Sequence, residues 1–454
     1  MTEFLGSIWW LIVSLGVLVT IHEFGHYWVA RRSGVKVLRF SIGFGRALWK
    51  RVGKDGTEYV VAAIPLGGYV KMLDEREGEV PASQRAQAFN NQSVYKRIAI
   101  VFAGPLANLI LCVTLLWAMF VIGRPDYAPV VGQVDGIAAE AGLRPGDTLL
   151  AIGNRATPTW SDAQMALIPA ALDHADVRVQ VRTAAGTEAE RELRLSSLPA
   201  EFDERRAVEA IGLTARHELA PALIGRVVPE SAGWGVLAEG DVITAIDGEP
   251  IARADEVRPA VQRLGERGVP AMVEVRRDGE RLALELAPRR MQDPQTGDAY
   301  WGLGIALAAG APPAKDAVLR YGPVAAVPAA LREGVHQTRE IFAMIGRAFS
   351  GKVSVENTVA GPITIARAAN AYASHGAAWY LSMLAMLSLS LGILNLLPIP
   401  ILDGGHLLYY LIELVKGSPV SERVMAAGQY VGLALIASLM GLAFYNDIVN
   451  NLVR

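Results

Sequence analysis

The sequence predicts a multi-pass α-helical membrane protein with a globular segment between its second and third membrane spans. Of its 454 residues, 52% are hydrophobic and only 19% are charged, whereas soluble domains average about 25% charged residues. The apolar residues gather in four long stretches, and the segment between the second and third stretch repeats its own sequence. We therefore expect four transmembrane helices and an outer segment built from two similar domains.

The charge balance and the cysteine count exclude several classes of protein. The 43 Lys and Arg nearly cancel the 45 Asp and Glu, so the chain lacks the basic surplus that is typical of nucleic-acid binding. Its single cysteine, Cys112, excludes a disulfide framework and a multi-cysteine metal site. We expect no nucleic-acid partner, and we expect Cys112 to be a buried apolar residue of the second span.

A helix needs about 20 mostly apolar residues to cross a bilayer. The N-terminus has neither a basic region nor a small-residue cleavage site, so the first stretch is expected to stay in the protein as a span. The predicted spans cover residues 1–30, 98–123, 379–402 and 424–446.

Basic residues predict the orientation of these spans. Residues 31–97 carry 13 Lys and Arg, and none precedes the first span. The positive-inside rule then places 31–97 in the cytoplasm and the N-terminus outside. Four spans also put 124–378 outside, which is the periplasm in a bacterium, and leave 403–423 as a cytoplasmic loop.

The outer segment contains an internal repeat. Residues 141–152 align with 235–246, and each copy has Gly-Asp before an apolar run, which is typical of a turn that re-enters a sheet. This pattern resembles tandem PDZ domains of α+β type, at residues 124–218 and 219–312. The resemblance implies a sheet edge that accepts an extended peptide; a spacer or size filter is an equally open interpretation.

A helical segment is expected at residues 313–378. Within it, residues 325–349 place apolar side chains at helical spacing with charged residues between them. This spacing predicts an amphipathic helix, either lying on the membrane surface or packed against the two repeated domains.

The strongest chemical signal is the run His22-Glu23-Phe24-Gly25-His26 in the first span. Two histidines four residues apart lie on one helix face, where both imidazoles can reach one Zn²⁺ at about 2.0–2.1 Å. Glu23 is then placed to deprotonate a metal-bound water. Ionisable residues inside a span are costly and usually functional. The alternative is a pair of core histidines held by hydrogen bonds, with Glu23 paired to one of them.

Asp403 is the candidate for the third protein ligand that a catalytic zinc requires. It ends the third apolar run, after Pro398 and Pro400, which break the helix. A broken helix at membrane depth is tolerated where it lines a cavity or is buried in protein. The alternative is that Asp403 only caps a helix, and His406 is a weaker alternative ligand.

The second and third apolar spans each contain one asparagine. Asn395 is surrounded by Leu and Ile, and its amide is suited to a substrate carbonyl or a developing oxyanion; a hydrogen bond between helices is the alternative. Asn108 follows the small residues Ala103 and Gly104, so we interpret it as part of a close helix contact.

Together these motifs resemble the site-2 protease family of intramembrane zinc metalloproteases. The resemblance rests on HEFGH at 22–26, FAGPLAN at 102–108, GPITIA at 361–366, NLLP at 395–398, LDGG at 402–405 and the two PDZ-like units. It implies that His22, His26 and Asp403 bind Zn²⁺. It also implies that Glu23 is the catalytic base and that Asn395 contacts the substrate.

The resemblance carries further implications. It makes residues 59–72 part of a membrane-reentrant β-hairpin near the zinc, whose edge could hold the substrate extended; a cytoplasmic surface hairpin is the alternative. It implies a single-span membrane-protein substrate that has already been trimmed outside, typically an anti-sigma factor of the envelope stress response, or a remnant signal peptide. The PDZ-like units would exclude untrimmed substrates. It places the protein in the bacterial inner membrane, with its site near the cytoplasmic face, and we expect a monomer.

Two other classes of protein fit parts of the sequence. A membrane scaffold would gather partners through the PDZ-like units and carry out no chemistry. A metal transporter would use the histidines as a transport site, but four spans with one metal site leave little room for a pathway.

Overall fold

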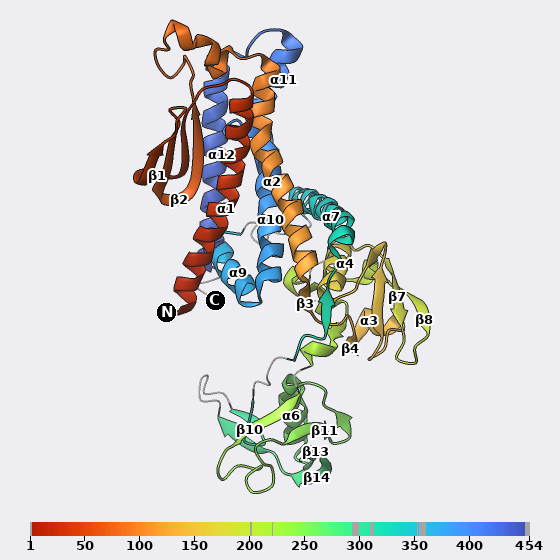
Figure 1. Cartoon of the computed structure of the whole chain (residues 1–454). Coiled ribbons are helices and arrows are strands. Elements are labelled where there is room, and N and C mark those ends of the chain that lie inside the picture. Colours follow the sequence, from red (N-terminus) through yellow and green to blue (C-terminus); the bar gives the residue numbers. More distant parts are fainter. Residues whose placement is uncertain are drawn as a thin grey trace. The chain divides into compact units, whose positions relative to one another are not determined.

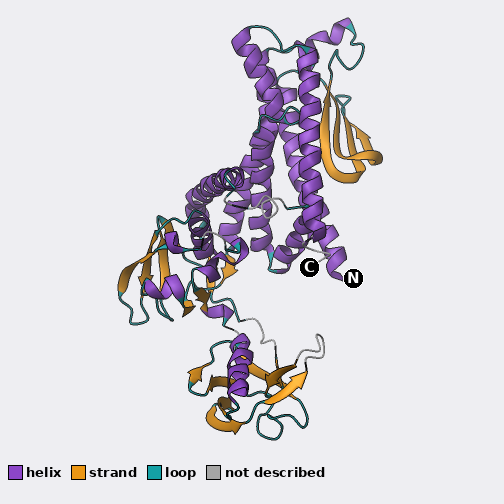
Figure 2. Cartoon of the chain, turned by 180° about the vertical axis from the view of Figure 1, so that it is seen from behind, coloured by secondary structure: helices purple, strands orange, loops and turns teal. Residues whose placement is uncertain are grey.

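The structure is a computed structural model that describes residues 2–199, 202–219, 221–292, 299–308, 313–351, 353 and 360–449. The chain forms two compact units. The helical unit contains Met1–Pro125 and Leu319–Arg454, and the strand-rich unit contains Asp126–Val318. Figure 2 shows the difference in their secondary structure. The candidate site lies in the helical unit and the sequence repeat in the strand-rich unit.

Within the described residues, four helices are long and apolar enough to cross a membrane. Each overlaps one of the four predicted spans, so the prediction of a four-span membrane protein is confirmed at this level. Helices α1 and α10 both pack on α2, and Figure 1 shows them side by side. The four helices are α1 (Thr2–Arg32), α2 (Val94–Ile122), α10 (Ala377–Leu396) and α12 (Glu422–Ile448).

Helix α2 is the centre of the helical unit. Cys112 and Leu116 on α2 are buried in an apolar cluster with residues of α10 and α7 (Pro323–Phe349). Helix α7 contributes small alanines to this cluster, while Val324 and Leu331 on its other face are exposed. The amphipathic helix predicted near 325–349 therefore packs on a membrane-spanning helix, a partner that the sequence did not indicate.

The third span ends earlier than predicted. Helix α10 stops at Leu396, and Pro398 and Pro400 follow, because proline cannot continue the hydrogen-bond ladder of a helix. The chain then starts a new helix, α11 (Asp403–Lys416), inside the segment expected to be a loop. Asp403 is therefore the first residue of a helix. A further helix, α9 (Pro362–Ser374), precedes α10.

The segment after α1 forms a β-hairpin of β1 (Val37–Val52) and β2 (Glu58–Met72), which packs beside α1 (Figure 1). Both strands bend, so Ile42 pairs with Gly68 on one side and with Val61 on the other. The result is a small sheet with the order 68–72, 37–42, 58–62, 47–52. Among the described residues, 68–72 has a strand partner on one side only, so it is an open edge.

The strand-rich unit contains two copies of one arrangement, each with its own apolar core. In the first copy the sheet order is β6-β5-β7-β8, with β4 paired to β9; in the second it is β14-β13-β11-β10-β17, with β12 on β11. The first copy contains β4 (Val131–Val134), α3 (Gly136–Glu140), β5 (Thr148–Ile152), β6 (Arg155–Ala156), α4 (Trp160–Leu172), β7 (Val177–Arg182), β8 (Glu188–Leu193), α5 (Ala207–Ala210) and β9 (Leu213–Ala215). The second contains β10 (Ala222–Val227), β11 (Val242–Ile246), β12 (Glu249–Pro250), α6 (Val257–Arg267), β13 (Ala271–Arg277), β14 (Glu280–Leu286), β15 (Arg289–Gln292), β16 (Ala299–Gly302) and β17 (Ile305–Leu307). Two short strands, β3 (Arg124–Asp126) and β18 (Ala317–Leu319), complete the described α-helices and β-strands.

The repeated Gly-Asp pair has the same structural role in both copies. Asp147 and Asp241 are both buried, and each precedes the strand that the sequence predicts. The Asp147 carboxylate accepts the backbone amide of Arg144 at 3.0 Å, and Asp241 accepts that of Ala238 at 2.8 Å. Each aspartate thus closes the turn that leads into its strand, which explains why the pair recurs.

Candidate metal centre

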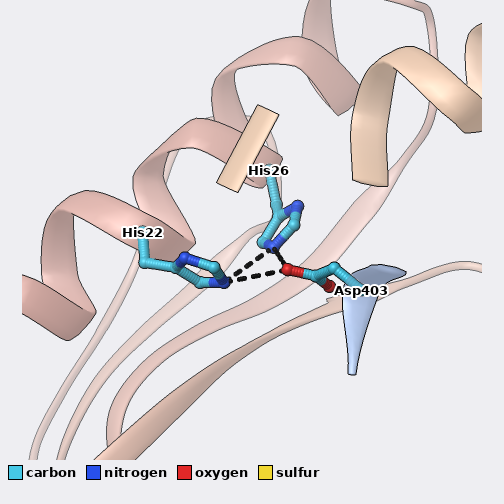
Figure 3. A group of neighbouring side chains, drawn as sticks. All are labelled: His22, His26 and Asp403. Atoms are coloured by element: carbon cyan, nitrogen blue, oxygen red, sulfur yellow. Dashed lines mark hydrogen bonds and ion pairs between the residues drawn. The ribbon is translucent and has the colours of Figure 1, made fainter. Parts of the chain in front are cut away.

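Helix α1 presents both motif histidines on one face. His22 and His26 lie one turn apart, and each is 8% exposed. Their Nε2 atoms approach to 3.2 Å, with the rings nearly perpendicular. Figure 3 shows both rings projecting from the same side of the helix.

Asp403 meets these histidines from the start of α11. Its Oδ2 atom lies 3.1 Å from His22 Nε2 and 3.3 Å from His26 Nε2. Figure 3 shows the three side chains converging on one point. The structure thus brings together three residues from opposite ends of the chain, as the sequence motifs predicted.

The three atoms fit a zinc ion by chemistry and by spacing. Two neutral imidazoles and a carboxylate form a donor set that is typical of catalytic zinc, which keeps a fourth position open. Ligands about 2.0–2.1 Å from a tetrahedral ion lie roughly 3.3–3.4 Å from one another. The observed spacings of 3.1, 3.2 and 3.3 Å are close to that value.

Helix α2 leaves room for the two imidazoles at Gly104. A Cβ atom at this position would lie 2.5 Å from His26 Cε1 and 2.9 Å from His22 Nε2, and still closer to His26 Nε2. Ordinary contacts begin at about 3.4 Å, so a side chain here would displace the rings. The sequence indicated a close helix contact at Gly104; the contact is with the two histidines.

Backbone and amide groups of α2 hold the outer nitrogens of both rings. His26 Nδ1 lies 2.8 Å from the Ile100 carbonyl, and His22 Nδ1 lies 3.2 Å from Asn108 Nδ2. This contact between Asn108 and His22 was not predicted from the sequence. The signal available for it was an amide in an otherwise apolar span, one turn after Gly104.

The hairpin passes directly over Glu23. A Cβ atom on Gly68 would lie 2.7 Å from the Ser41 carbonyl and 3.0 Å from Glu23 Cγ, so only glycine allows this approach. Val70 of the same strand lines the cleft together with Glu23. The strand thus lies directly against Glu23, beside the two histidines.

These groups line one cleft of about 800 Å³. Asn395 lies in its wall and donates from Nδ2 to the Leu391 carbonyl at 3.0 Å, within its own helix. His406 also lines the cleft but lies outside the group of three converging side chains. Burial lowers the pKa of the His406 imidazole below its usual value.

An ion pair anchors the helix that carries Asp403. Arg97 on α2 donates to Glu413 on α11 at 2.6 Å, and both side chains are largely buried. The guanidinium also lies 4.9 Å from the centre of the Tyr410 ring. These contacts tie α11 to α2, the helix against which the histidines pack.

A membrane-spanning helix that carries a His-Glu-x-x-His motif, with an aspartate from another helix facing its two histidines, is typical of an intramembrane metalloprotease. The chain belongs to peptidase family M50, the site-2 protease family, whose family model matches residues 10–439. It is a zinc metalloprotease.

Particular relatives are similar over their whole length. A protein of Xylella fastidiosa, named as a zinc metalloprotease, is 53% identical over 449 residues, covering 99% of this chain and 100% of the relative. The regulator of sigma-E protease RseP of Escherichia coli is 41% identical over 451 residues, covering 98% of this chain and 99% of the relative. The protease RseP of Yersinia pestis is 39% identical, with similar coverage. The sequence resemblance to site-2 proteases is thus confirmed.

Proposed function

We propose that this protein is an endopeptidase that cuts single-span membrane proteins within or near their transmembrane helix. The observation that carries the proposal is the convergence of His22, His26 and Asp403 next to Glu23, inside a cleft formed by membrane-spanning helices and the hairpin. We assign the three converging residues as the zinc ligands, Glu23 as the general base and Asn395 as a substrate contact.

In this mechanism zinc, when bound, polarises the scissile carbonyl and lowers the pKa of water towards about 7. Glu23 takes a proton from the attacking water and delivers it to the leaving amine. The close approach of the backbone at Gly68 limits the room in which the Glu23 side chain can move during both transfers. Asn395 is near enough to the cleft to bind a substrate carbonyl once its amide leaves the Leu391 carbonyl.

The hairpin supplies a means of presenting the substrate. A peptide bond in a helix is shielded by its own hydrogen-bond ladder, so a substrate helix must unwind before it is cut. The edge at 68–72 lines the cleft, and among the described residues no second strand pairs with it, so it can accept an extended chain. Substrate helices that contain Gly or Ser unwind at lower cost.

The relatives support a proposal for the substrate class and the location. One of them is named regulator of sigma-E protease RseP, and another is named protease RseP. We therefore propose a trimmed anti-sigma factor as the substrate, with remnant signal peptides as a second class of substrate. The protein then lies in the bacterial inner membrane as a monomer. Its N-terminus and repeated domains face the periplasm, and its site lies near the cytoplasmic side.

The two repeated domains are proposed to be PDZ-like. Their common order of elements and the buried Asp147 and Asp241 turns support a common origin. Each is large enough to block a bulky ectodomain while admitting a short stub. Capture of a peptide by a strand edge is the other role that this kind of fold offers.

The test is cleavage of a trimmed single-span substrate by the purified protein in detergent, with and without a zinc chelator. Glu23→Gln should keep bound zinc but lose at least about 100-fold in rate, the usual contribution of general-base catalysis. Glu3→Gln, on the same helix, is the matched control and should cleave normally. If the protein were a scaffold without chemistry, Glu23→Gln and Glu3→Gln would both keep full function. A cleavage rate of Glu23→Gln equal to that of wild type would overturn the assignment of Glu23 as the base.

A further inference from the structure

Asn108 is buried in α2 with its side chain against His22. It is 0% exposed, and its Nδ2 lies 3.2 Å from His22 Nδ1. Its Oδ1 is also buried and has no hydrogen-bond partner among the described residues. The Ser388 hydroxyl of α10 donates to the Asn108 backbone carbonyl at 2.8 Å, which holds this part of α2 in place.

The partner of Nδ1 determines which nitrogen of a neutral imidazole is free to bind a metal. The Ile100 carbonyl beside His26 can only accept a hydrogen bond, so His26 Nδ1 carries the proton. Its Nε2 then has a free lone pair directed at Asp403. For His22 to act as a ligand in the same way, its Nδ1 must also carry a proton, and this proton needs an acceptor.

Asn108 is the side chain that can supply this acceptor. With Nδ2 facing a protonated Nδ1, two donors would oppose each other at 3.2 Å. A half-turn of the amide about the Cβ–Cγ bond exchanges the two atoms and brings Oδ1 to the His22 proton. Unlike the Ile100 carbonyl, an amide offers both a donor and an acceptor, so it can pair with either neutral form of His22.

We infer that Asn108 is a positioning residue that sets the neutral form of His22, and that its amide turns Oδ1 towards Nδ1–H when zinc binds. The inference rests on the proposed assignment of His22, His26 and Asp403 as ligands. In the arrangement seen here, Nδ2 donates to Nδ1, and His22 Nε2–H faces Asp403. Zinc binding therefore exchanges one amide orientation for the other.

The test measures zinc affinity by competition with a chelator, on full-length protein in detergent, for three substitutions. Asn108→Leu removes the acceptor at similar volume and should weaken zinc binding by about 10- to 100-fold, the usual effect of losing the partner of a ligating histidine. Asn108→Asp keeps the acceptor and should bind zinc more tightly than Asn108→Leu. Ser388→Ala removes the neighbouring hydrogen bond but leaves the amide, and should bind zinc like wild type.

Nitrogen NMR of the imidazoles gives a second readout that altered packing alone would not move. Zinc-loaded wild type should show His22 protonated at Nδ1, and this signal should change in Asn108→Leu. If that variant does not fold, Asn108→Ala is compared with Asn108→Asp. Equal zinc affinity in all Asn108 variants, or an equal loss in Ser388→Ala, would overturn the inference. Asp403→Ala tests the proposed ligand set separately from the role of Asn108. If Asp403→Ala retained zinc, the assignment of His22, His26 and Asp403 as ligands would be overturned.

Discussion

Replacing Gly104 by alanine tests whether the geometry of the metal centre depends on this gap in α2. The added methyl group would lie 2.5 Å from His26 Cε1, whereas ordinary contacts begin at about 3.4 Å. The His26 ring, or the helix that carries it, must therefore move by at least about 0.9 Å, because His26 Nε2 is closer still. His22 Nε2, at 2.9 Å from the same methyl group, must move by about 0.5 Å.

These displacements affect two of the three proposed ligands at once. A misplacement of about 1 Å at a catalytic group can cost roughly 100-fold in rate. We therefore expect Gly104→Ala to lose about 100-fold or more in cleavage rate and to bind zinc more weakly. The fold should survive, because alanine is a better helix former than glycine.

The assay compares zinc content, cleavage rate and thermal unfolding of Gly104→Ala with those of Gly16→Ala. Gly16 lies in α1, and a Cβ atom there would meet nothing within 4 Å. The control variant should therefore match wild type in all three measurements. Wild-type zinc affinity and rate in Gly104→Ala would refute the reasoning, because they would mean that the rings yield without loss of function.

Two further predictions concern stability. Asp241 is 1% exposed and accepts two hydrogen bonds of 2.7 Å from Arg277, which holds its pKa below the usual 3.8; Asp241→Asn should lower the free energy of unfolding by about 1–3 kcal/mol. Because the pKa of Asp241 is lower in the folded state, this stabilisation is fully present above pH 3.8 and is lost as the pH falls through the folded pKa. The thermal unfolding temperatures of wild type and Asp241→Asn should therefore converge in acid. In the control variant Asp255→Asn, where the side chain is exposed, the unfolding temperature should change little at any pH. Asp447 on α12 accepts hydrogen bonds from the backbone amides of Ile363 and Thr364 at the start of α9. Asp447→Ala should lower the free energy of unfolding by about 1–2 kcal/mol and speed hydrogen exchange at these two amides. Unchanged exchange would show that this cap is not needed.

The four spans could be predicted because the signal is strong and local. Each span is a long apolar run, and the backbone groups of such a run must be satisfied by a helix in lipid. The end of the third span was placed six residues too late, at 402 instead of Leu396. Residues 397–402 are apolar, so the predicted span followed the apolar run past Pro398 and Pro400, although both prolines were expected to break the helix.

The ligand set could be proposed from sequence, but its supports could not. His22 and His26 are paired by helical spacing, and Asp403 stands out as a carboxylate at the end of an apolar run. The contacts that hold them come from α2, at Ile100, Gly104 and Asn108. Nothing local in α2 indicates which neighbouring helix its small and polar residues face, because helix pairing is a property of the tertiary structure. Asn108 was accordingly interpreted as a packing residue.

The contacts around the three proposed ligand atoms explain how these atoms are held close together. Two imidazole nitrogens and a carboxylate oxygen lie within 3.3 Å of one another. Contacts from outside this group also hold their side chains in position: the Ile100 carbonyl lies against His26, Asn108 faces His22, and the Arg97–Glu413 ion pair fixes α11 on α2. Because all three supports come from α2, movement of this one helix relative to α1 would disturb every ligand together. Helix α2 therefore acts as the scaffold of the metal centre, although it contributes no ligand of its own.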